Sequence, residues 1–233
     1  MEFNGLIPGT LLRRYKRFLA DVQLTDGRTV TAHCPNSGSM KMCCTPGWEV
    51  RLSLHDNPRR KLKYTWELVH NTSCWIGVNT QVPNRIAAEA IAAGAIPELN
   101  GYGSLRREVR YGRNSRIDLL LEEDARRCYV EVKNVTLIGD DGRFVFPDAV
   151  TTRGRKHLRE LSDVVQSGDR GVMLYVIQRS DGSGFRTAGE IDPAYTDALR
   201  NAHETGVEVL AYRADVSPAG VRLAERVPWE PAR

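Results

Sequence analysis

Hydrophobic and polar residues alternate in short runs over residues 1 to about 75, and turn-forming residues separate the runs. Asp26-Gly27 is a strong hairpin signal within this stretch. The pattern predicts five short strands with little helix between them, over residues 10–15, 18–24, 29–34, 49–54 and 62–69. Five strands of this kind are typical of a small β-barrel such as an OB-fold.

The pattern changes after residues 77–84, which we interpret as a linker. Asn84 is placed to cap a helix that runs through Ala92, and Gly94 and Pro97 end it. An apolar stripe predicts a second helix, formed by Leu158, Leu161, Val164 and Val165.

The later strands are predicted from continuous apolar runs. Residues 171–179 form such a run, which is typical of a central strand buried on both faces. A third helix (194–204) and a final strand (207–212) follow, and the tail from residue 216 is expected to pack only partly. The chain is therefore predicted to be mixed α+β, with an OB-like barrel over residues 1–80. An α/β domain with a mixed central sheet flanked by helices is predicted over residues 81–233.

Residues 115–137 predict a hairpin whose turn centres on Asp124 and Ala125. The strand register then pairs residues whose numbers sum to 249, which places Asp118 opposite Glu131, with Cβ atoms about 5 Å apart. Glu131 shares its strand face with Lys133. Two carboxylates that close repel each other unless a cation lies between them, and Mg²⁺ prefers such oxygen ligands.

This Asp-x12-Glu-x-Lys pattern resembles the PD-(D/E)xK nuclease-like superfamily, although Ile117 stands where a proline often precedes the aspartate. The resemblance implies that Asp118 and Glu131 bind the metal and that Lys133 acts on the reacting water and phosphate. An acid-x-Lys triplet occurs by chance about once or twice in a chain of this length, so an ordinary solvated hairpin face is the alternative. Lysine is rare in this chain, at 6 residues against 27 arginines, which favours the site.

Glu89 is the one acid inside the predicted helix that precedes the hairpin. A buried acid is costly unless it is paired or serves a metal, so Glu89 is a further candidate ligand. The alternative is an exposed glutamate paired with Arg85 at i, i+4.

Composition narrows the class of protein. The chain has 233 residues, of which 41% are hydrophobic and 27% charged, so it can bury ordinary cores. No apolar run reaches the roughly 18 residues of a membrane span, and the N-terminus lacks a secretory signal. The five cysteines are therefore expected to be reduced thiols in the cytoplasm. Adjacent Cys43-Cys44 lacks the usual gap between zinc ligands, which argues against zinc.

Positive charge is concentrated in the first third of the chain. Residues 1–83 hold 11 Lys and Arg against 6 Asp and Glu, whereas residues 84–233 hold 22 against 23. This asymmetry favours nucleic acid as the partner, with a solvated basic face as the alternative. The candidate phosphate contacts are basic residues in two aromatic-containing runs, in the turn over residues 36–41 and at the start of the second helix: Arg13, Arg14, Lys16, Arg17, Lys41, Lys61, Lys63, Arg153 and Lys156. The nearby aromatics Tyr64 and Trp66 are interpreted as core.

Several long motifs, in order, resemble the sugar fermentation stimulation protein A (SfsA) family over nearly the full length. They are F-N-G-L-I-P-G-T-L-L-R-R-Y-K-R-F, A-H-C-P-N-S-G-S-M, residues 115–134, F-P-D-A-V-T-T-R-G-R-K-H-L and G-V-M-L-Y-V-I-Q-R. The resemblance implies an OB-like N-terminal domain, a PD-(D/E)xK-like C-terminal domain and DNA binding.

Two functions follow as hypotheses. The first is a Mg²⁺- or Mn²⁺-dependent nuclease that acts at Asp118, Glu131 and Lys133. The second is a non-catalytic, largely sequence-nonspecific DNA-binding regulator affecting sugar metabolism, in which the nuclease-like core is structural. A third, less specific reading is an α/β protein that binds an acidic metabolite. Strandedness of the nucleic acid and a homo-oligomeric state stay open.

Overall fold

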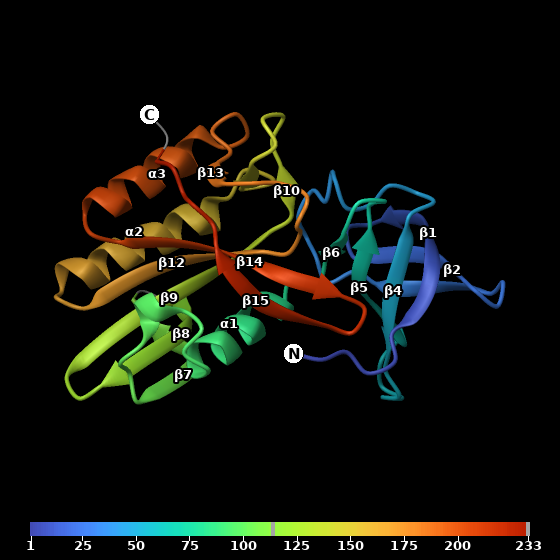
Figure 1. Ribbon diagram of the computed structural model, residues 1–233, viewed down its shortest axis with the longest axis horizontal. Helices are drawn as coiled ribbons and strands as arrows, with labels where there is room; N and C mark the ends of the chain where they lie inside the picture. The colour runs from blue at the N-terminus through green and yellow to red at the C-terminus, as the bar shows by residue number, and fades with distance from the viewer. Residues whose placement is uncertain (113–114, 232–233) are drawn as a thin grey trace.

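The computed structural model describes residues 1–112 and 115–231. Its first part is a six-stranded sheet in the order β3-β2-β1-β4-β5-β6, in which a parallel β3–β5 pairing closes the first five strands into a barrel. The strands are β1 Ile7–Tyr15, β2 Leu19–Leu24, β3 Thr29–His33, β4 Glu49–Leu54, β5 Tyr64–His70 and β6 Trp75–Gly77. The predicted OB-like barrel is confirmed (Figure 1).

Alternating side chains fill the barrel, as the sequence pattern requires. Trp66 is fully buried, and its indole Nε1 donates to the Leu68 carbonyl at 2.9 Å. Tyr64 packs beside the same core, so the interpretation of these aromatics as core is confirmed. Cys34 and Cys43 are also buried in it, and all five cysteines are free thiols.

The second part is built on a six-stranded mixed sheet in the order β15-β14-β12-β9-β8-β7. Its strands are β7 Ser104–Tyr111, β8 Ser115–Glu123, β9 Arg126–Val135, β12 Arg170–Ile177, β14 Glu208–Ser217 and β15 Gly220–Arg226. A small sheet beside it contains β10 Leu137–Ile138, β11 Phe144–Phe146 and β13 Phe185–Thr187. The helices are α1 Val82–Ala92, the 3₁₀ turn η1 Pro97–Leu99, α2 Thr152–Gln166 and α3 Pro193–Glu204.

Helices cover both faces of the mixed sheet (Figure 1). The apolar residues of α1 pack with Val130 and Val132 on one face, while those of α2 and α3 pack with Met173 and Tyr175 on the other. Asp192 joins the two helices on the second face: it caps α3 by accepting from Tyr195 N at 3.0 Å and also accepts from Thr151 N at 2.8 Å. The predicted α/β architecture is confirmed.

Two local predictions were wrong, and one strand was missed. The tail packs only partly, as expected, since most side chains of residues 220–226 are exposed or half-buried, but these residues form a strand, β15, that pairs with β14. Asn84 does not cap α1: the helix begins earlier, with Gln81 as the cap and a proline in its first turn, where proline's fixed φ suits a helix start. Residues 77–84 are not an exposed linker, because several of them, including Val78 and Asn79, are buried in the fold.

The two parts meet along a buried polar seam. Gly77 N donates to the Gln178 carbonyl at 3.0 Å, and Gln178 Nε2 donates back to the Gly77 carbonyl at 3.2 Å. Arg179 is 1% exposed and donates to the Thr136 carbonyl at 2.6 Å, and the Cys43 thiol of the barrel reaches that same carbonyl. Residues 1–3 also cross over, because they lie against β15. No helix among the described residues is long and apolar enough to cross a membrane.

Candidate nuclease-like site

The β8–β9 hairpin has the predicted register. Its pairs run from Glu123–Arg126 to Leu119–Val130, and all of them sum to 249. The backbone pairing of β8 and β9 ends just before Asp118 and Glu131. Beyond that point the Val132 amide donates to the Asp118 side chain instead of to a main-chain carbonyl of β8, with Oδ2 accepting at 2.8 Å. The two acids therefore lie where β8 and β9 part.

Asp118 is held from two sides. Asn84, in the first turns of α1, donates its amide to Oδ1 at 2.7 Å, while Val132 N holds Oδ2. Burial raises the pKa of Asp118 to about 6, and the nearby Glu131 adds to the rise. The carboxyl therefore titrates just below neutral pH instead of near 4.

Glu131 is 2% exposed, and two donors meet one of its oxygens. Lys133 Nζ lies 2.5 Å from Oε1, and His157 Nδ1 contacts the same atom. Burial acts to raise the pKa of Glu131, but Lys133 and His157 together hold it below its ordinary value. The other oxygen, Oε2, is buried and has no hydrogen-bond partner among the described residues.

His157 is a site residue that the sequence analysis did not single out. It lies on the buried face of α2, four residues before Leu161, and this position on the apolar stripe could have marked it as a buried histidine in the sequence. Arg153 Nε donates to His157 Nε2 at 3.3 Å, so Nε2 accepts and Nδ1 carries the proton toward Glu131. The basic turn of α2 thus orients the histidine.

Tyr111 and Glu160 extend the acidic wall of the site. Burial raises the pKa of Tyr111, and the charges of Glu131, Glu160 and Asp118 add to the rise, so the phenol stays neutral. The Tyr111 hydroxyl and Glu160 Oε2 are both buried without a hydrogen-bond partner in the described parts of the chain. Glu160 Oε1 accepts from Ser115 at 2.8 Å.

Glu89 is not brought to these residues. Its side chain is 44% exposed and pairs with Arg85 at 2.9 Å and with the Met1 amine at 2.7 Å. The alternative weighed from the sequence, an exposed i, i+4 pair, is what the structure shows. Within residues 1–112 and 115–231, no group of three or more His, Cys, Asp or Glu side chains could hold a metal ion.

The Asp118–Glu131 pair nevertheless fits a divalent ion. Mg²⁺ commonly binds through one or two carboxylates and completes its shell with waters and substrate phosphates. Glu131 Oε2 supplies a buried oxygen that has no partner among the described residues, and Asp118 is a half-buried acid whose pKa is raised even though the charge of Lys133 partly offsets the rise. Both features are relieved by a cation between the two side chains.

The candidate phosphate contacts fall into two groups. The side chains of Lys16, Arg17, Lys41, Lys61 and Lys63 are exposed on the barrel, and Arg153 is exposed at the start of α2. Arg153 also donates to His157, and the remaining candidates have partners as well. Arg13 pairs with Asp21 at 2.8 Å and Lys156 lies 3.6 Å from Glu160.

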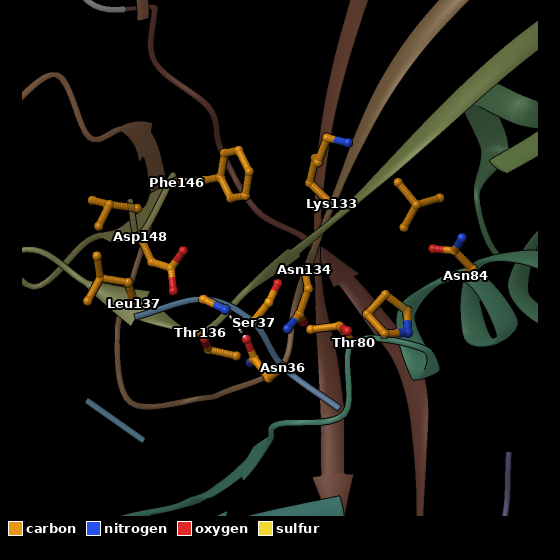
Figure 2. Close-up of a pocket in the computed structure, with 14 residues that line it drawn as sticks. Asn36, Ser37, Thr80, Asn84, Lys133, Asn134, Thr136, Leu137, Phe146 and Asp148 are labelled. Atoms are coloured by element: carbon orange, nitrogen blue, oxygen red, sulfur yellow. Dashed lines mark hydrogen bonds between the residues drawn. The ribbon is translucent and has the colours of Figure 1, made fainter. Parts of the chain in front are cut away.

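Arg14 has a structural role. Its Nη2 donates to the carbonyls of Asn36 and Gly38, at 2.9 and 3.0 Å, and its Nη1 reaches the carbonyl of Ser39. The arginine therefore fixes the loop between β3 and β4, which lies against the second domain (Figure 2).

Comparisons with known proteins agree with this architecture. The family model described as "SfsA N-terminal OB domain" matches residues 12–78, and "Sugar fermentation stimulation protein RE domain" matches residues 81–220. The sugar fermentation stimulation protein homolog of Geobacter sulfurreducens is 61% identical over 223 residues, covering 96% of this chain and 95% of the relative. The homolog of Geobacter metallireducens is 62% identical over 224 residues, covering 96% of both chains.

A solved structure shows the same arrangement of both domains. SfsA of Pyrococcus furiosus, in complex with Ca²⁺, has a TM-score of 0.90 to this structure at 26% identity, covering 99% of this chain and 98% of that one. Family models, near full-length relatives and a matching two-domain structure coincide, and the chain belongs to the sugar fermentation stimulation protein (SfsA) family.

Proposed function

We propose that this protein is a divalent-metal-dependent nuclease that cleaves phosphodiester bonds in DNA. The observation that carries the proposal is the Glu131 carboxylate: Oε1 meets both Lys133 and His157, while Oε2 is buried near Asp118 and has no hydrogen-bond partner among the described residues. A buried carboxylate oxygen without a donor is costly in a folded protein. A cation at Oε2 removes that cost.

Asp118 and Glu131 are the residues that would hold Mg²⁺ or Mn²⁺. The ion supplies a Lewis acid for the scissile phosphate. SfsA of P. furiosus was solved in complex with Ca²⁺, which supports the proposal that this chain binds a divalent cation. Asn84 and the Val132 amide hold both oxygens of Asp118, which keeps its carboxylate in place for the ion.

Lys133 and His157 have different roles in this proposal. Lys133 is 15% exposed at its side chain, so its ammonium can reach a phosphate and offset developing negative charge. It can also orient the attacking water. His157 is 5% exposed and contacts Glu131 but not Asp118. It is therefore a positioning residue that orients the Glu131 carboxylate. Arg153 fixes the tautomer of His157.

The barrel supplies the nucleic-acid contacts. Its exposed cations Lys16, Arg17, Lys61 and Lys63 would neutralise backbone phosphates. Binding of that kind depends little on base sequence and weakens steeply with salt.

The test is cleavage of single- and double-stranded DNA and RNA with Mg²⁺, Mn²⁺ or chelator. Glu131→Ala and Lys133→Ala are each expected to abolish cutting while DNA binding stays largely intact. Glu122→Ala is the matched control, because Glu122 lies on the same hairpin but forms exposed pairs with Arg106 and Arg127. Cutting that survives either of the first two changes would sink the assignment.

One observation favours a second function. Lys133 already forms an ion pair with Glu131 and His157 donates to the same carboxylate, so the core can persist without an ion. A non-catalytic DNA-binding regulator would show salt-sensitive binding and no turnover with either metal. The cleavage panel therefore separates the two.

A further inference from the structure

A cavity of about 280 Å³ lies between the barrel and the α/β domain, beside Lys133. The barrel contributes the loop at Asn36–Gly38, and the second domain contributes residues of β9 and β11 together with Asp148. Figure 2 shows Lys133, Phe146, Asp148 and Asn36 around a common space. The volume is just below the roughly 300–1,000 Å³ of pockets for drug-sized ligands, so it suits a smaller group.

The lining carries mostly neutral hydrogen-bonding groups. They are the amides and hydroxyls of Asn36, Ser37, Thr80, Asn84, Asn134 and Thr136. Lys133 is the one cation in the lining, and Asp148 is the one anion. Such a lining suits neither a phosphate, which Asp148 repels, nor a purely apolar ligand. It suits a flat, neutral heterocycle that has donors and acceptors at its edge, with Phe146 as an aromatic surface.

Asp148 presents one oxygen to this space. Its Oδ2 accepts from Ser39 Oγ at 3.2 Å and from Met40 N at 3.4 Å. No donor among the described residues reaches Oδ1. A carboxylate oxygen without a donor can accept from an exocyclic amino group, which adenine, cytosine and guanine carry and thymine lacks.

We propose that this cavity binds one unpaired nucleobase that carries an exocyclic amino group, next to the phosphate that meets Lys133. A base stacked in a duplex cannot enter a pocket of this kind without leaving its pair. The substrate is therefore a single strand, or a duplex with an unpaired or extruded nucleotide. The inference rests on nucleic acid being the substrate of the proposed function.

The walls are fixed before any ligand arrives. Arg14 holds the carbonyls of Asn36 and Gly38, and Asn36 accepts from Gly38 N at 2.8 Å. On the opposite side, Asn134 Oδ1 accepts from Gln178 at 2.8 Å. A preformed site loses little freedom on binding, so its selectivity follows from its fixed polar groups.

The test measures binding without divalent metal, in chelator, using fluorescently labelled 12-nucleotide strands of dA, dC or dT and a duplex. The wild-type protein is expected to bind single strands more tightly than the duplex, with dA and dC about five- to tenfold tighter than dT. In Asp148→Asn, the amide oxygen takes the Oδ2 position opposite Ser39 and Met40. Its NH₂ group then faces the cavity and favours the thymine carbonyl, so the preference for dA and dC is expected to reverse.

Two controls keep the result interpretable. Asp140→Asn, an exposed position in the turn between β10 and β11, should leave the base preference unchanged. Ser37→Trp fills the cavity from its exposed barrel side and should abolish the preference, whereas the exposed Ser73→Trp should not. Thermal unfolding confirms that each variant is folded.

Three results overturn the inference: equal binding of duplex and single strand, a base preference that Asp148→Asn leaves intact, and nucleoside monophosphates that bind as tightly as the strands. The last result assigns the cavity to a free nucleotide. Because metal is absent throughout, a protein that binds as expected but never cleaves contradicts the nuclease proposal and leaves this one standing.

Discussion

Among the described residues, two donors contact one oxygen of Glu131 and none contacts the other, and this asymmetry is the main feature of the site at the scale of single residues. Lys133 and His157 approach Oε1 from different elements, β9 and α2. Oε2 is left buried beside Asp118, whose own pKa is raised. The site thus stores unfavourable electrostatics that a cation would relieve, which is common where side chains are arranged for function.

Asp118→Asn is expected to stabilise the metal-free protein at pH 8 by about 1–3 kcal/mol, and to have little effect near pH 4. The folded-state pKa of about 6 lies above the ordinary 3.8, so the folded protein binds the proton more strongly. Stability from that proton is present at low pH and is lost as pH rises from about 4 to about 6. Denaturant titrations in chelator at both pH values measure the difference. An equal change at both would contradict the assigned pKa.

The same pKa predicts the pH dependence of cation binding. An ion competes with the Asp118 proton, so its affinity is expected to fall by up to about tenfold per pH unit below pH 6 and to level off above it. Calorimetric titration with Ca²⁺ between pH 5 and pH 8 avoids any dependence on cleavage. A flat affinity across this range would exclude Asp118 as a ligand.

His157→Phe keeps the ring volume and removes the donor to Glu131. Loss of an orienting partner of a metal ligand is expected to weaken divalent-ion affinity about 10- to 100-fold. His157→Gln restores a donor and should recover part of the loss, which a purely packing role would not. His203→Phe is the control, because His203, in α3, packs edge-on against Trp229 and does not contact Glu131. Titration calorimetry reads the affinity directly.

At the scale of elements, two arginines of the β1–β2 hairpin, Arg14 and Arg17, are expected to have different roles, one in the stability of the fold and the other in DNA binding. Arg14→Ala removes donors to three carbonyls of the loop after β3 and is expected to lower the free energy of unfolding by about 1–3 kcal/mol. Arg17→Ala, in the exposed β1–β2 turn, should change it by less than about 0.5 kcal/mol. Arg17→Ala should instead lower the slope of log affinity for DNA against log salt by about one. A larger loss of stability in Arg17→Ala than in Arg14→Ala, with the salt slope changed only in Arg14→Ala, would contradict these roles.

Most elements could be predicted because their periodicity is local. The barrel strands, the continuous apolar run of β12 and the β8–β9 register all follow from side-chain alternation and turn residues. Strand β15 could not be predicted with confidence, because its partner β14 makes it a strand and the run itself is exposed on one side.

The site was predictable only where it lies on one hairpin. Asp118, Glu131 and Lys133 are close in sequence and share a register. His157, Asn84 and the cavity depend on α2, α1 and the barrel loop, whose approach to the hairpin is set by long-range packing. Glu89 satisfied the rule for a buried acid in its sequence context, but its helix turns it toward solvent and the Met1 amine.

For the whole molecule, the seam between the domains predicts a single unfolding transition. Gln178 and Arg179 bond to main-chain carbonyls across or beside the junction, and separating the domains would leave these buried groups without partners. Three of the four tryptophans lie in the barrel, whereas the described helices all lie in the second domain. Tryptophan fluorescence and helical circular dichroism should therefore report the same midpoint in denaturant. Two separate midpoints would show that the domains unfold independently.

The cavity draws its walls from both domains, whereas the carboxylate pair belongs to one hairpin of the second domain. If both proposals hold, the two properties can change separately. Substitutions in the loop at Asn36–Gly38 would then reshape one wall of the base pocket, while Asp118 and Glu131, the proposed metal-binding pair, stay unchanged. Among relatives that share the hairpin, divergence in that short barrel loop would accordingly point to a change of substrate.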